Sequence, residues 1–256
     1  MQHLLQAISK WGVIISFVLL LLSLVYKDRL PDPDHYEVRR LVDPVQESTF
    51  RSPFWIEAEG ERYRIKPLYE YSLEGVVVSF HDADSFSDIW HHDRWKDFLN
   101  VRDLCVIWGS NVSNGVYQDM SFDNDSWTCW AYWPDAQTGA NFQMNQLSNN
   151  HLLVNDDTIK EELMSAEPGD HIRISGQLAS YENPSNNFKR GSSTRRDDTG
   201  NGACETIYVE RFEIVSKANT RWRGVHTFSV WSLGLFLIAF LILFINTPPK
   251  RKSTIY

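Results

Sequence analysis

The sequence predicts a mainly β protein, in which a small β-barrel domain with short helices is flanked by two transmembrane helices. Two uncharged apolar runs, at residues 11–26 and 227–247, predict the flanking helices. Between them, alternation of apolar and polar residues over 71–215 is typical of half-buried strands. A chain of 256 residues is long enough for both helices and such a domain.

The chain divides into seven segments at the ends of these patterns. They are an N-terminal segment (1–10), the first transmembrane helix (11–26), a stalk and lead-in (27–70), the β-rich soluble domain (71–215), a juxtamembrane linker (216–226), the second transmembrane helix (227–247) and a basic C-terminal tail (248–256). Five prolines from Pro31 to Pro67 interrupt the lead-in. This composition favours an irregular stalk.

The second apolar run is rich in Leu, Ile and Phe, and as a helix it crosses a hydrocarbon core of ~30 Å. The first run is shorter, but the long side chains of Lys10 and Lys27 extend its effective span. A cleavable signal peptide is the rival interpretation of this run. Because no Ala-x-Ala pattern follows it, we favour an uncleaved anchor.

Two crossings place both termini on one side of the membrane and the domain on the other. Lys and Arg residues near the helix ends nearly balance, with a slight excess on the domain side. However, a domain of this length is translocated largely regardless of charge. Three cysteines among many Trp residues and few Lys residues favour an exported domain, and hence cytoplasmic termini.

Charge is segregated along the chain. All 33 acidic residues lie between Asp28 and Glu213, whereas that span holds only 17 of the 25 basic residues, a net charge of −16. A surface this acidic repels phosphate backbones. We therefore predict no nucleic-acid partner.

Alternating or β-branched runs predict the strands of the domain. We expect them at residues 73–80, 104–108, 126–133, 171–178 and 205–215, with another short one at 142–147. Apolar residues on one helical face predict a helix from Ser85 to about Asn100. Residues 155–166 predict a second helix, because acids fill its first turn and Pro168 and Gly169 follow its end.

The resulting order of three strands, a helix and two strands is typical of an OB-like β-barrel, a small closed sheet without free edges. The spelling Gly-Asp-x-Ile-x-Ile-x-Gly-x-Leu at residues 169–178 resembles the fourth strand of such a barrel. The resemblance is one of pattern, because the insertion at 81–103 and the loop before Cys204 depart from a minimal barrel. A different barrel of about five or six strands stays open.

Three further spellings resemble segments of an uncharacterised family of bacterial two-pass membrane proteins. They are Asp103-Leu-Cys-Val-Ile-Trp-Gly109, Leu147-Ser-Asn-Asn-His-Leu-Leu153 and Asp198-Thr-Gly-Asn-Gly-Ala-Cys-Glu-Thr-Ile-Tyr208. The resemblance implies a bacterial envelope setting and transfers no chemistry. Together with two crossings, it predicts a protein of the bacterial inner membrane with both termini cytoplasmic and the domain periplasmic.

Three cysteines allow three disulfide pairings, each of which leaves one thiol. Cys129 and Cys204 are the disulfide candidates, because their bond would staple down the loop before Cys204. Cys105 lies in an apolar strand and is predicted to be free and buried. The alternative for Cys204 is a nucleophile activated by nearby arginines, with His151 or His171 as its base.

Residues 81–93 hold the one dense group of His and Asp side chains. The candidate ligands of a divalent metal are His81, Asp82, Asp84, His91 and His92. Their spacing matches no established ligand motif, and adjacent His91 and His92 point to different faces of a helix. A solvated helix face is the favoured interpretation, and no other cofactor is predicted.

The one basic concentration of the acidic domain precedes Cys204. It comprises Lys189, Arg190, Ser192, Ser193, Arg195 and Arg196. Arginine forks beside the backbone N–H groups of Gly/Ser turns suit an anion or a carboxylate, so these residues are candidates for binding a ligand or partner. Local pairing with Asp197 and Asp198 is the equally weighted alternative.

Trp127, Trp130, Tyr132 and Trp133 form a dense aromatic set. Such side chains stack on sugars or bases, but base stacking is disfavoured without a basic groove beside them. In a small barrel they are more often core and wall, which is the interpretation that we favour.

These patterns favour a membrane-anchored binding or assembly module without evident catalytic activity. Its expected partners are the membrane and another envelope protein, or a second copy of the chain. The alternative is a metal- or thiol-dependent envelope hydrolase that uses residues 81–93 or Cys204. Metal analysis and thiol titration of the purified domain discriminate between the two.

Overall fold

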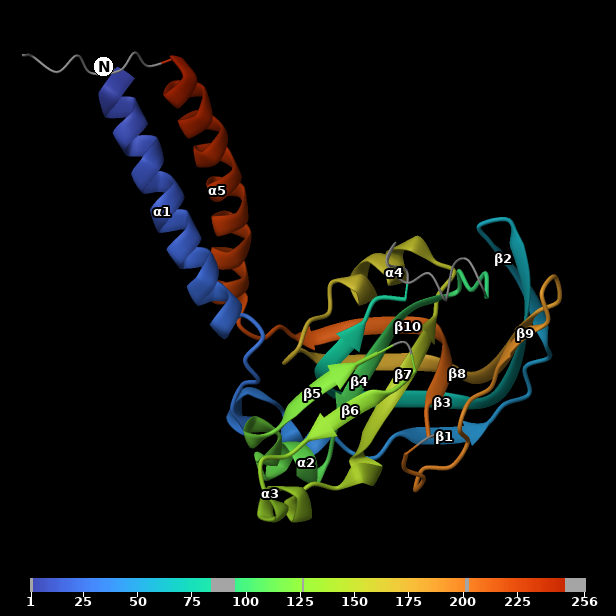
Figure 1. Ribbon diagram of the computed structural model, residues 1–256. Helices are drawn as coiled ribbons and strands as arrows, with labels where there is room; N and C mark the ends of the chain where they lie inside the picture. Colours follow the sequence, from blue (N-terminus) through green and yellow to red (C-terminus); the bar gives the residue numbers. More distant parts are fainter. Residues whose placement is uncertain (1, 84–94, 126, 201–202, 247–256) are drawn as a thin grey trace, which may run out of the picture. The chain divides into compact units, whose positions relative to one another are not determined.

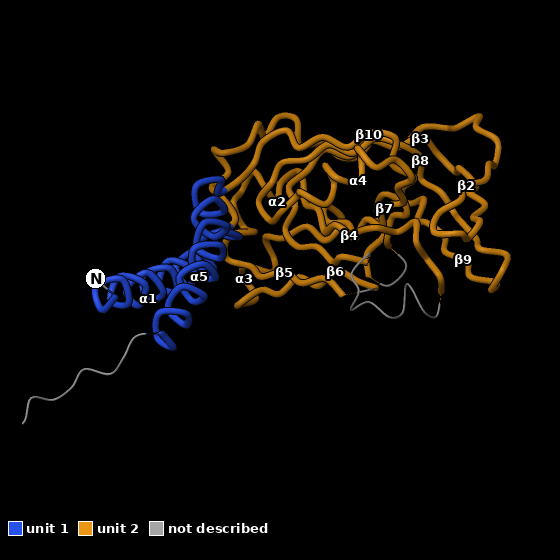
Figure 2. Tube along the Cα trace, turned by 90° about the horizontal axis from the view of Figure 1, so that it is seen from above, with its two compact units in different colours: residues 1–29, 219–256 blue, residues 30–218 orange. Residues whose placement is uncertain are grey.

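The computed structural model describes residues 2–83, 95–125, 127–200 and 203–246, and the chain forms two compact units (Figures 1 and 2). The first unit combines residues 1–29 and 219–256 from the two ends of the chain. The second comprises residues 30–218. The predicted stalk at 27–70 is therefore wrong, because nearly all of it belongs to the second unit.

Two long helices make up the first unit. α1 (Gln2–Tyr26) and α5 (Thr220–Asn246) are both long and apolar enough to cross a membrane, as predicted. α1 begins well before the predicted start at residue 11. Lys10 interrupts the apolar run there, but lysine is a good helix former and leaves the helix intact.

The helices α1 and α5 lie side by side (Figure 1), and the residues of α1 that are buried are small and polar. Ser9, Ser16 and Ser23, spaced seven apart, are the buried residues of α1. The hydroxyls of Ser16 and Ser232 are 2.8 Å apart and share a hydrogen bond. Small side chains let two helices approach closely, and a buried hydroxyl pair adds a contact that hydrocarbon cannot replace.

Five strands of the second unit pair in a closed circuit. In order around it they are β3 (Glu61–His81), β4 (Asn100–Ile107), β7 (Leu147–Leu153), β10 (Glu205–Ser216) and β8 (His171–Asn183), and β8 pairs again with β3. β7 and β10 are parallel, and the other neighbours are antiparallel. The prediction of a β-rich domain between two apolar helices is confirmed.

One strand of this circuit lies at other residues than predicted. We predicted strands at 126–133 and 142–147, whereas 147–153 forms β7 and Met144–Gln146 is a single 3-10 turn, η5. β7 carries the buried polar side chains of Ser148, Asn149, Asn150 and His151. Because these residues are polar on both faces of the strand, a search for apolar alternation does not find it.

Strand β3 reaches far into the predicted stalk. β2 (Phe54–Ala58) pairs with its first residues, β1 (Val45–Ser48) with residues 69–72, and β9 (Phe188–Arg190) lies beyond β8. Two 3-10 turns, η1 (Pro33–His35) and η2 (Val38–Arg40), lead into β1. Pro67 lies where the register between β3 and β8 shifts, a position that tolerates proline inside a sheet.

A separate hairpin lies in the chain between β4 and β7. β5 (Ser121–Asn124) pairs with β6 (Cys129–Tyr132), which is the predicted strand at 126–133 in shortened form. Short helical segments precede and follow it: α2 (Ser110–Ser113), η4 (Val116–Asp119) and α3 (Ala136–Asn141). The hairpin forms a sheet of its own rather than a strand of the circuit.

The predicted helix at 155–166 is present as α4 (Asp157–Met164), between β7 and β8. The Asp156 carboxylate caps it by accepting hydrogen bonds from the backbone N–H groups of Thr158 and Ile159, at 2.9 and 3.0 Å. Of the predicted helix at 85–100, residues 85–94 lie outside the described part of the chain. Residues 95–99 are not helical, so its predicted end is wrong.

The core of the second unit lies within the closed circuit. Its fully buried side chains include Leu73, Leu104, Leu152, Ile172, Ile174, Leu178 and Ile207, which come from all five strands. At Gly176 a Cβ would overlap the backbone oxygen of Tyr208. β10 shifts register between Val209 and Arg211 at this point, so only glycine lets the two strands meet.

Candidate functional site

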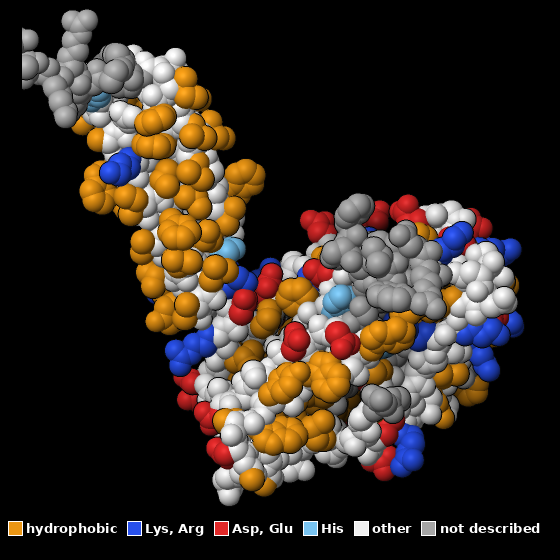
Figure 3. All heavy atoms as spheres, in the orientation of Figure 1, with side chains coloured by type: hydrophobic (Ala, Val, Ile, Leu, Met, Phe, Trp, Pro, Cys, Tyr) orange, Lys and Arg blue, Asp and Glu red, His pale blue; other side chains and the backbone are white. Residues whose placement is uncertain are grey.

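The β5–β6 hairpin presents an exposed aromatic surface, consisting of Trp127, Trp130, Tyr132 and Trp133 (Figure 3). These residues are 58%, 48%, 51% and 47% exposed, respectively. The prediction that they form core and wall is wrong, because Cys129 and Ala131 occupy the inward positions of β6 instead. A cluster of exposed large apolar side chains is typical of an interaction site.

Asp125 holds part of the aromatic surface in place. Its Oδ1 accepts hydrogen bonds from the backbone N–H groups of Trp127 and Thr128, at 2.8 Å each, and its Oδ2 accepts one from the indole Nε1 of Trp130 at 2.9 Å. Burial acts to raise the pKa of Asp125, but these hydrogen bonds outweigh it and lower the pKa below its ordinary value. The carboxylate is therefore ionised at neutral pH and adds negative charge beside the rings.

A cavity of about 190 Å³ opens beside the aromatic surface. Trp130, Trp133, Met144 and Leu147 supply its apolar walls, and Asp198 is the carboxylate at its edge. Pockets that hold whole small molecules usually measure about 300–1,000 Å³. This one is the size of a single large side chain.

Three contacts fasten the hairpin to the main sheet. A disulfide joins Cys105 of β4 to Cys129 of β6, with their Cα atoms 5.7 Å apart. The amide Nδ2 of Asn124 donates to Oδ1 of Asn149 at 2.8 Å, and the hydroxyl of Ser79 donates to Oδ1 of Asn124. The aromatic surface is therefore carried by a hairpin with fixed attachments to β3, β4 and β7.

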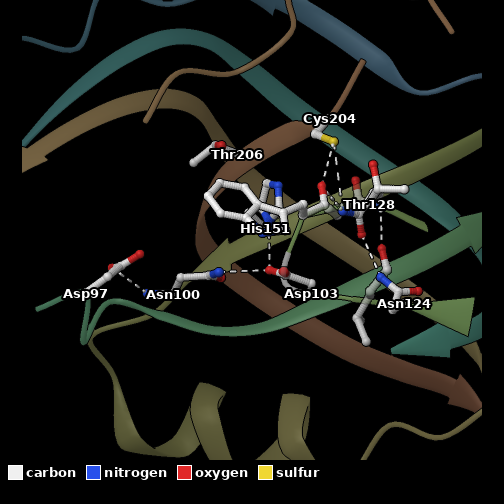
Figure 4. Close-up of polar contacts among 12 residues, drawn as sticks. Asp97, Asn100, Asp103, Asn124, Thr128, His151, Cys204 and Thr206 are labelled. Atoms are coloured by element: carbon white, nitrogen blue, oxygen red, sulfur yellow. Dashed lines mark hydrogen bonds and ion pairs between the residues drawn. The ribbon is translucent and has the colours of Figure 1, made fainter. Parts of the chain in front are cut away.

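The predicted disulfide between Cys129 and Cys204 is wrong, and so is the prediction of a free Cys105. Cys105 is fully buried, as expected. Its side chain faces the β5–β6 hairpin, however, and Cys129 of that hairpin lies close enough to form the disulfide. Cys204 is the free cysteine (Figure 4). Its thiol donates to the backbone oxygen of Trp127 at 3.6 Å and accepts from Nδ2 of Asn149 at 3.9 Å.

Cys204 lacks the surroundings of an activated nucleophile. Burial raises the pKa of its thiol to about 11, and the charge of Glu205 adds to this increase. Among the described residues, no hydrogen bond joins its sulfur to His151, whose Nδ1 lies 2.7 Å from Asp103 Oδ1 instead (Figure 4). The thiol-dependent version of the hydrolase alternative therefore lacks a thiolate at neutral pH.

The pair of His151 and Asp103 belongs to a buried polar row where β4 meets β7. Asn100 Nδ2 donates to the same oxygen of Asp103 at 2.8 Å. Burial acts to raise the pKa of Asp103, but the charge and hydrogen bond of His151 and the charge of Arg190 lower it. This row was not predicted, although the polar residues of 147–153 signal it at positions where a buried strand usually carries apolar side chains.

The six predicted loop residues do not share one binding site. The basic side chains form separate pairs, Lys189–Glu182 (3.2 Å), Arg195–Asp197 (3.3 Å) and Arg196–Glu205 (2.7 Å). The hydroxyl of Ser192 accepts from the backbone N–H of Thr206, and that of Ser193 donates to Asp198. These contacts correspond to the alternative of local pairing.

Arg190 differs from the other loop residues in the groups that surround its side chain. Its guanidinium is 5.8 Å from the centre of the Trp95 ring. Burial acts to lower the pKa of Arg190, but neighbouring Tyr181, Asp103 and Asp97 raise it. Its charge therefore helps to keep the buried carboxylates ionised.

Only two of the five predicted metal ligands lie in the described part of the chain. His81 ends β3 and Asp82 follows it, whereas Asp84, His91 and His92 are outside the described residues. Oδ1 of Asp82 accepts a hydrogen bond from Nε of Arg102 at 2.5 Å. Within the described ranges, no three His, Cys, Asp or Glu side chains gather as a metal site requires.

Comparisons with models of protein families, with curated proteins and with solved structures found no match to this chain. The resemblance to an uncharacterised family of bacterial two-pass membrane proteins therefore stays a prediction. Function has to be inferred from the geometry of the chain's own surfaces.

Proposed function

We propose that the chain is a membrane-anchored binding module that recognises another envelope protein through the aromatic surface of its β5–β6 hairpin. The observation that carries this proposal is the exposure of four large aromatic side chains, two of which, Trp130 and Trp133, line a cavity of about 190 Å³. Trp and Tyr are enriched among the residues that dominate the binding energy of protein interfaces. α1 and α5 serve as the two anchors.

The charge beside the aromatic surface favours a partner with basic side chains. Asp123 lies in β5 opposite Trp130, Asp125 lies in the turn that follows, and Asp198 lines the cavity. An Arg side chain placed over an exposed Trp ring gains a cation–π contact, and a nearby carboxylate strengthens its binding. The cavity suits one anchoring side chain of a protein better than a free ligand.

An OB-like barrel is the architecture that we propose for the second unit. Its support is the closed circuit of five strands, the parallel pairing of β7 with β10, and the position of α4 between β7 and β8. In OB-type barrels, the face of the second and third strands binds oligonucleotides or oligosaccharides. In this chain β4 and β7 correspond to those two strands, and the disulfide from β4 fastens the β5–β6 hairpin beside their face. We therefore propose that a partner contacts the aromatic surface of the hairpin instead.

We infer that the second unit lies in the periplasm of a bacterial cell, with both termini in the cytoplasm. Two apolar helices at opposite ends of the chain, each long enough to cross once, put both termini on one side. The disulfide between Cys105 and Cys129 supports an oxidising compartment for the part between them.

Site-specific photo-crosslinking of the full-length protein in intact cells tests the proposed contact. A photoreactive phenylalanine at Tyr132 should give discrete protein adducts, whereas the same group at Phe50, which is 98% exposed, should give none. Trp130→Ala combined with Trp133→Ala should reduce the adducts about tenfold or more, because Trp side chains are frequent hot spots. Equal adducts from both positions, or none from Tyr132, would refute the proposal.

A further inference from the structure

Cations gather on the outward face of β3, away from the aromatic surface. Arg62, Arg64 and Lys66 are exposed, and the residues between them, Tyr63 and Ile65, are fully buried. Alternate residues of a strand lie about 7 Å apart on the same face. Three like charges in such a row repel one another.

A groove of about 400 Å³ runs along this face. Four cationic residues, Arg64, Lys66, Lys189 and Arg190, line it, and Glu182 is the one carboxylate among its lining residues. The strand register places Arg64 opposite Glu182 and Glu182 opposite Lys189, so these side chains share one face. Ser180, opposite Lys66, adds a hydroxyl. The groove therefore carries a net positive charge in an acidic domain.

Glu182 does not neutralise the groove. Its Oε1 is 3.6 Å from Nη1 of Arg64, and its Oε2 is 3.2 Å from Nζ of Lys189. One carboxylate is thus divided between two cations. Within the described residues, no hydrogen bond or ion pair is made by the side-chain ammonium of Lys66, which leaves it available to a ligand.

An exposed aromatic ring borders the same face. The register of β2 and β3 places Trp55 opposite Arg64, and Trp55 is 47% exposed. The guanidinium of Arg62 lies 4.4 Å above this ring. An Arg that stacks on an aromatic ring keeps its N–H fork available for an anion. Trp55 therefore holds a further cation at the border of the groove.

We propose that this groove binds a small phosphate-bearing ligand, held by Arg64, Lys66 and Lys189. The planar fork of Arg matches two phosphate oxygens, and Lys supplies point charges to the same group. The charge of Arg190 is opposed by the buried carboxylates Asp97 and Asp103. Arg64, Lys66 and Lys189 have only the carboxylate of Glu182 among them, which leaves two positive charges for a phosphate dianion to balance. The volume lies within the range of small-molecule sites, so the group esterified to the phosphate has room as well. The ligand is a free phosphate ester or a phospholipid headgroup.

Calorimetric titration of the full-length protein in dodecyl maltoside, a detergent without phosphate, tests the proposal. The probes are inorganic phosphate, glycerol phosphate and a short-chain phosphatidylglycerol below its micelle concentration. We expect saturable binding of one equivalent. Lys66→Gln combined with Lys189→Gln should weaken it about tenfold or more, because each substitution removes a charged hydrogen-bond donor to the phosphate. Arg64→Gln should weaken binding as well.

The matched controls are Arg39→Gln and Arg211→Gln, which remove exposed cations outside the groove. Both should bind the probes as the unchanged protein does. Tighter binding of glycerol phosphate identifies a free ester, and tighter binding of the short-chain lipid identifies a headgroup. Absence of saturation by about 10 mM for every probe, or equal weakening in the controls, overturns the proposal.

The phosphate groove and the aromatic surface are independent proposals. Trp130→Ala combined with Trp133→Ala removes aromatic rings that do not line the groove, so it should leave phosphate binding unchanged. Conversely, the groove variants should leave crosslinking from Tyr132 intact. Failure of one proposal is therefore distinguishable from failure of the other.

Discussion

Glu205 illustrates how a single buried carboxylate couples folding to pH. It is 3% exposed at the start of β10, and Oε1 lies 2.7 Å from Nη1 of Arg196. Burial raises the pKa of Glu205 to about 7, and the charge and hydrogen bond of Arg196 offset only part of that increase. In the unfolded chain the pKa returns to about 4.3. Between pH ~4.3 and pH ~7, the folded state therefore binds one proton more than the unfolded chain.

Glu205 thus contributes a stability that is present below pH ~4.3 and is lost as the pH rises to about 7. Glu205→Gln removes this titration while keeping the shape of the side chain. The measured quantity is the free energy of unfolding of the variant minus that of the unchanged protein. We expect this difference to be about 3 kcal/mol more favourable to the variant at pH 8 than at pH 4. Urea unfolding followed by Trp fluorescence at several pH values measures this difference.

The matched control for this experiment is Glu47→Gln, because Glu47 is exposed on the short strand β1. A stability difference between Glu205→Gln and the unchanged protein that is the same at pH 4 and pH 8 contradicts the prediction. It would mean that Arg196 compensates the burial of the carboxylate in full.

At the same scale, the sequence named several important residues without revealing their surroundings. The aromatic set at 127–133 was recognised, but alternation shows only that Trp130 and Tyr132 share a face, and not whether that face meets the core or the solvent. Asp103 and His151 are far apart in sequence, and their hydrogen bond exists because β4 pairs with β7. Strand pairing, which no single residue reveals, decides both cases.

At the scale of elements, the junction of β8 and β10 depends on one glycine. A Cβ at Gly176 would overlap the backbone oxygen of Tyr208, and a backbone atom cannot move aside as a flexible side chain can. We expect Gly176→Ala to destabilise the second unit by about 1–3 kcal/mol, or to prevent its folding. Thermal unfolding followed by circular dichroism of the full-length protein measures the loss.

Gly191→Ala is the matched control, since a Cβ at Gly191 would have no atom within 4 Å. We expect this variant to unfold within a few degrees of the unchanged protein. Equal melting temperatures for Gly176→Ala and Gly191→Ala would show that β10 can move away from β8 without cost.

The elements that the sequence predicted well are those whose burial pattern is simple. β8 and β10 alternate apolar and polar residues, and α4 carries its capping residue and acidic first turn. β7 was missed because buried polar side chains occupy it. The first half of β3 was missed because prolines outweighed the alternation of Tyr63 and Ile65 with charged residues. Both errors arise where tertiary contacts, rather than local preference, stabilise a strand.

At the scale of the whole molecule, the order of elements indicated a closed sheet but not how it closes. Closure requires β3 to pair with both β4 and β8, and the 21 residues of β3 make this possible. Half of that strand lay in the predicted stalk. The disulfide was misassigned for a related reason, because the hairpin that carries Cys129 folds back over β4 instead of joining the circuit.

The membrane topology yields the last prediction. Alkaline phosphatase folds only in an oxidising compartment, where its own disulfides form. If residues 30–218 are periplasmic, the enzyme fused after Ala218 in place of α5 should be active, and a fluorescent protein that folds only in the cytoplasm should stay dark at the same junction. The opposite pair of signals would place the domain in the cytoplasm.

A thiol count separates this prediction from artefacts of truncation. The full-length protein, alkylated in cells and again after denaturation without reductant, should carry one alkyl group, on Cys204, because Cys105 and Cys129 are oxidised and their disulfide does not react. Cys204→Ala should show none. Three free thiols would mean a reducing compartment, and the charge excess on the domain side of the helices would then have set the orientation. The disulfide thus reports the side of the membrane on which the aromatic surface and the phosphate groove meet their ligands.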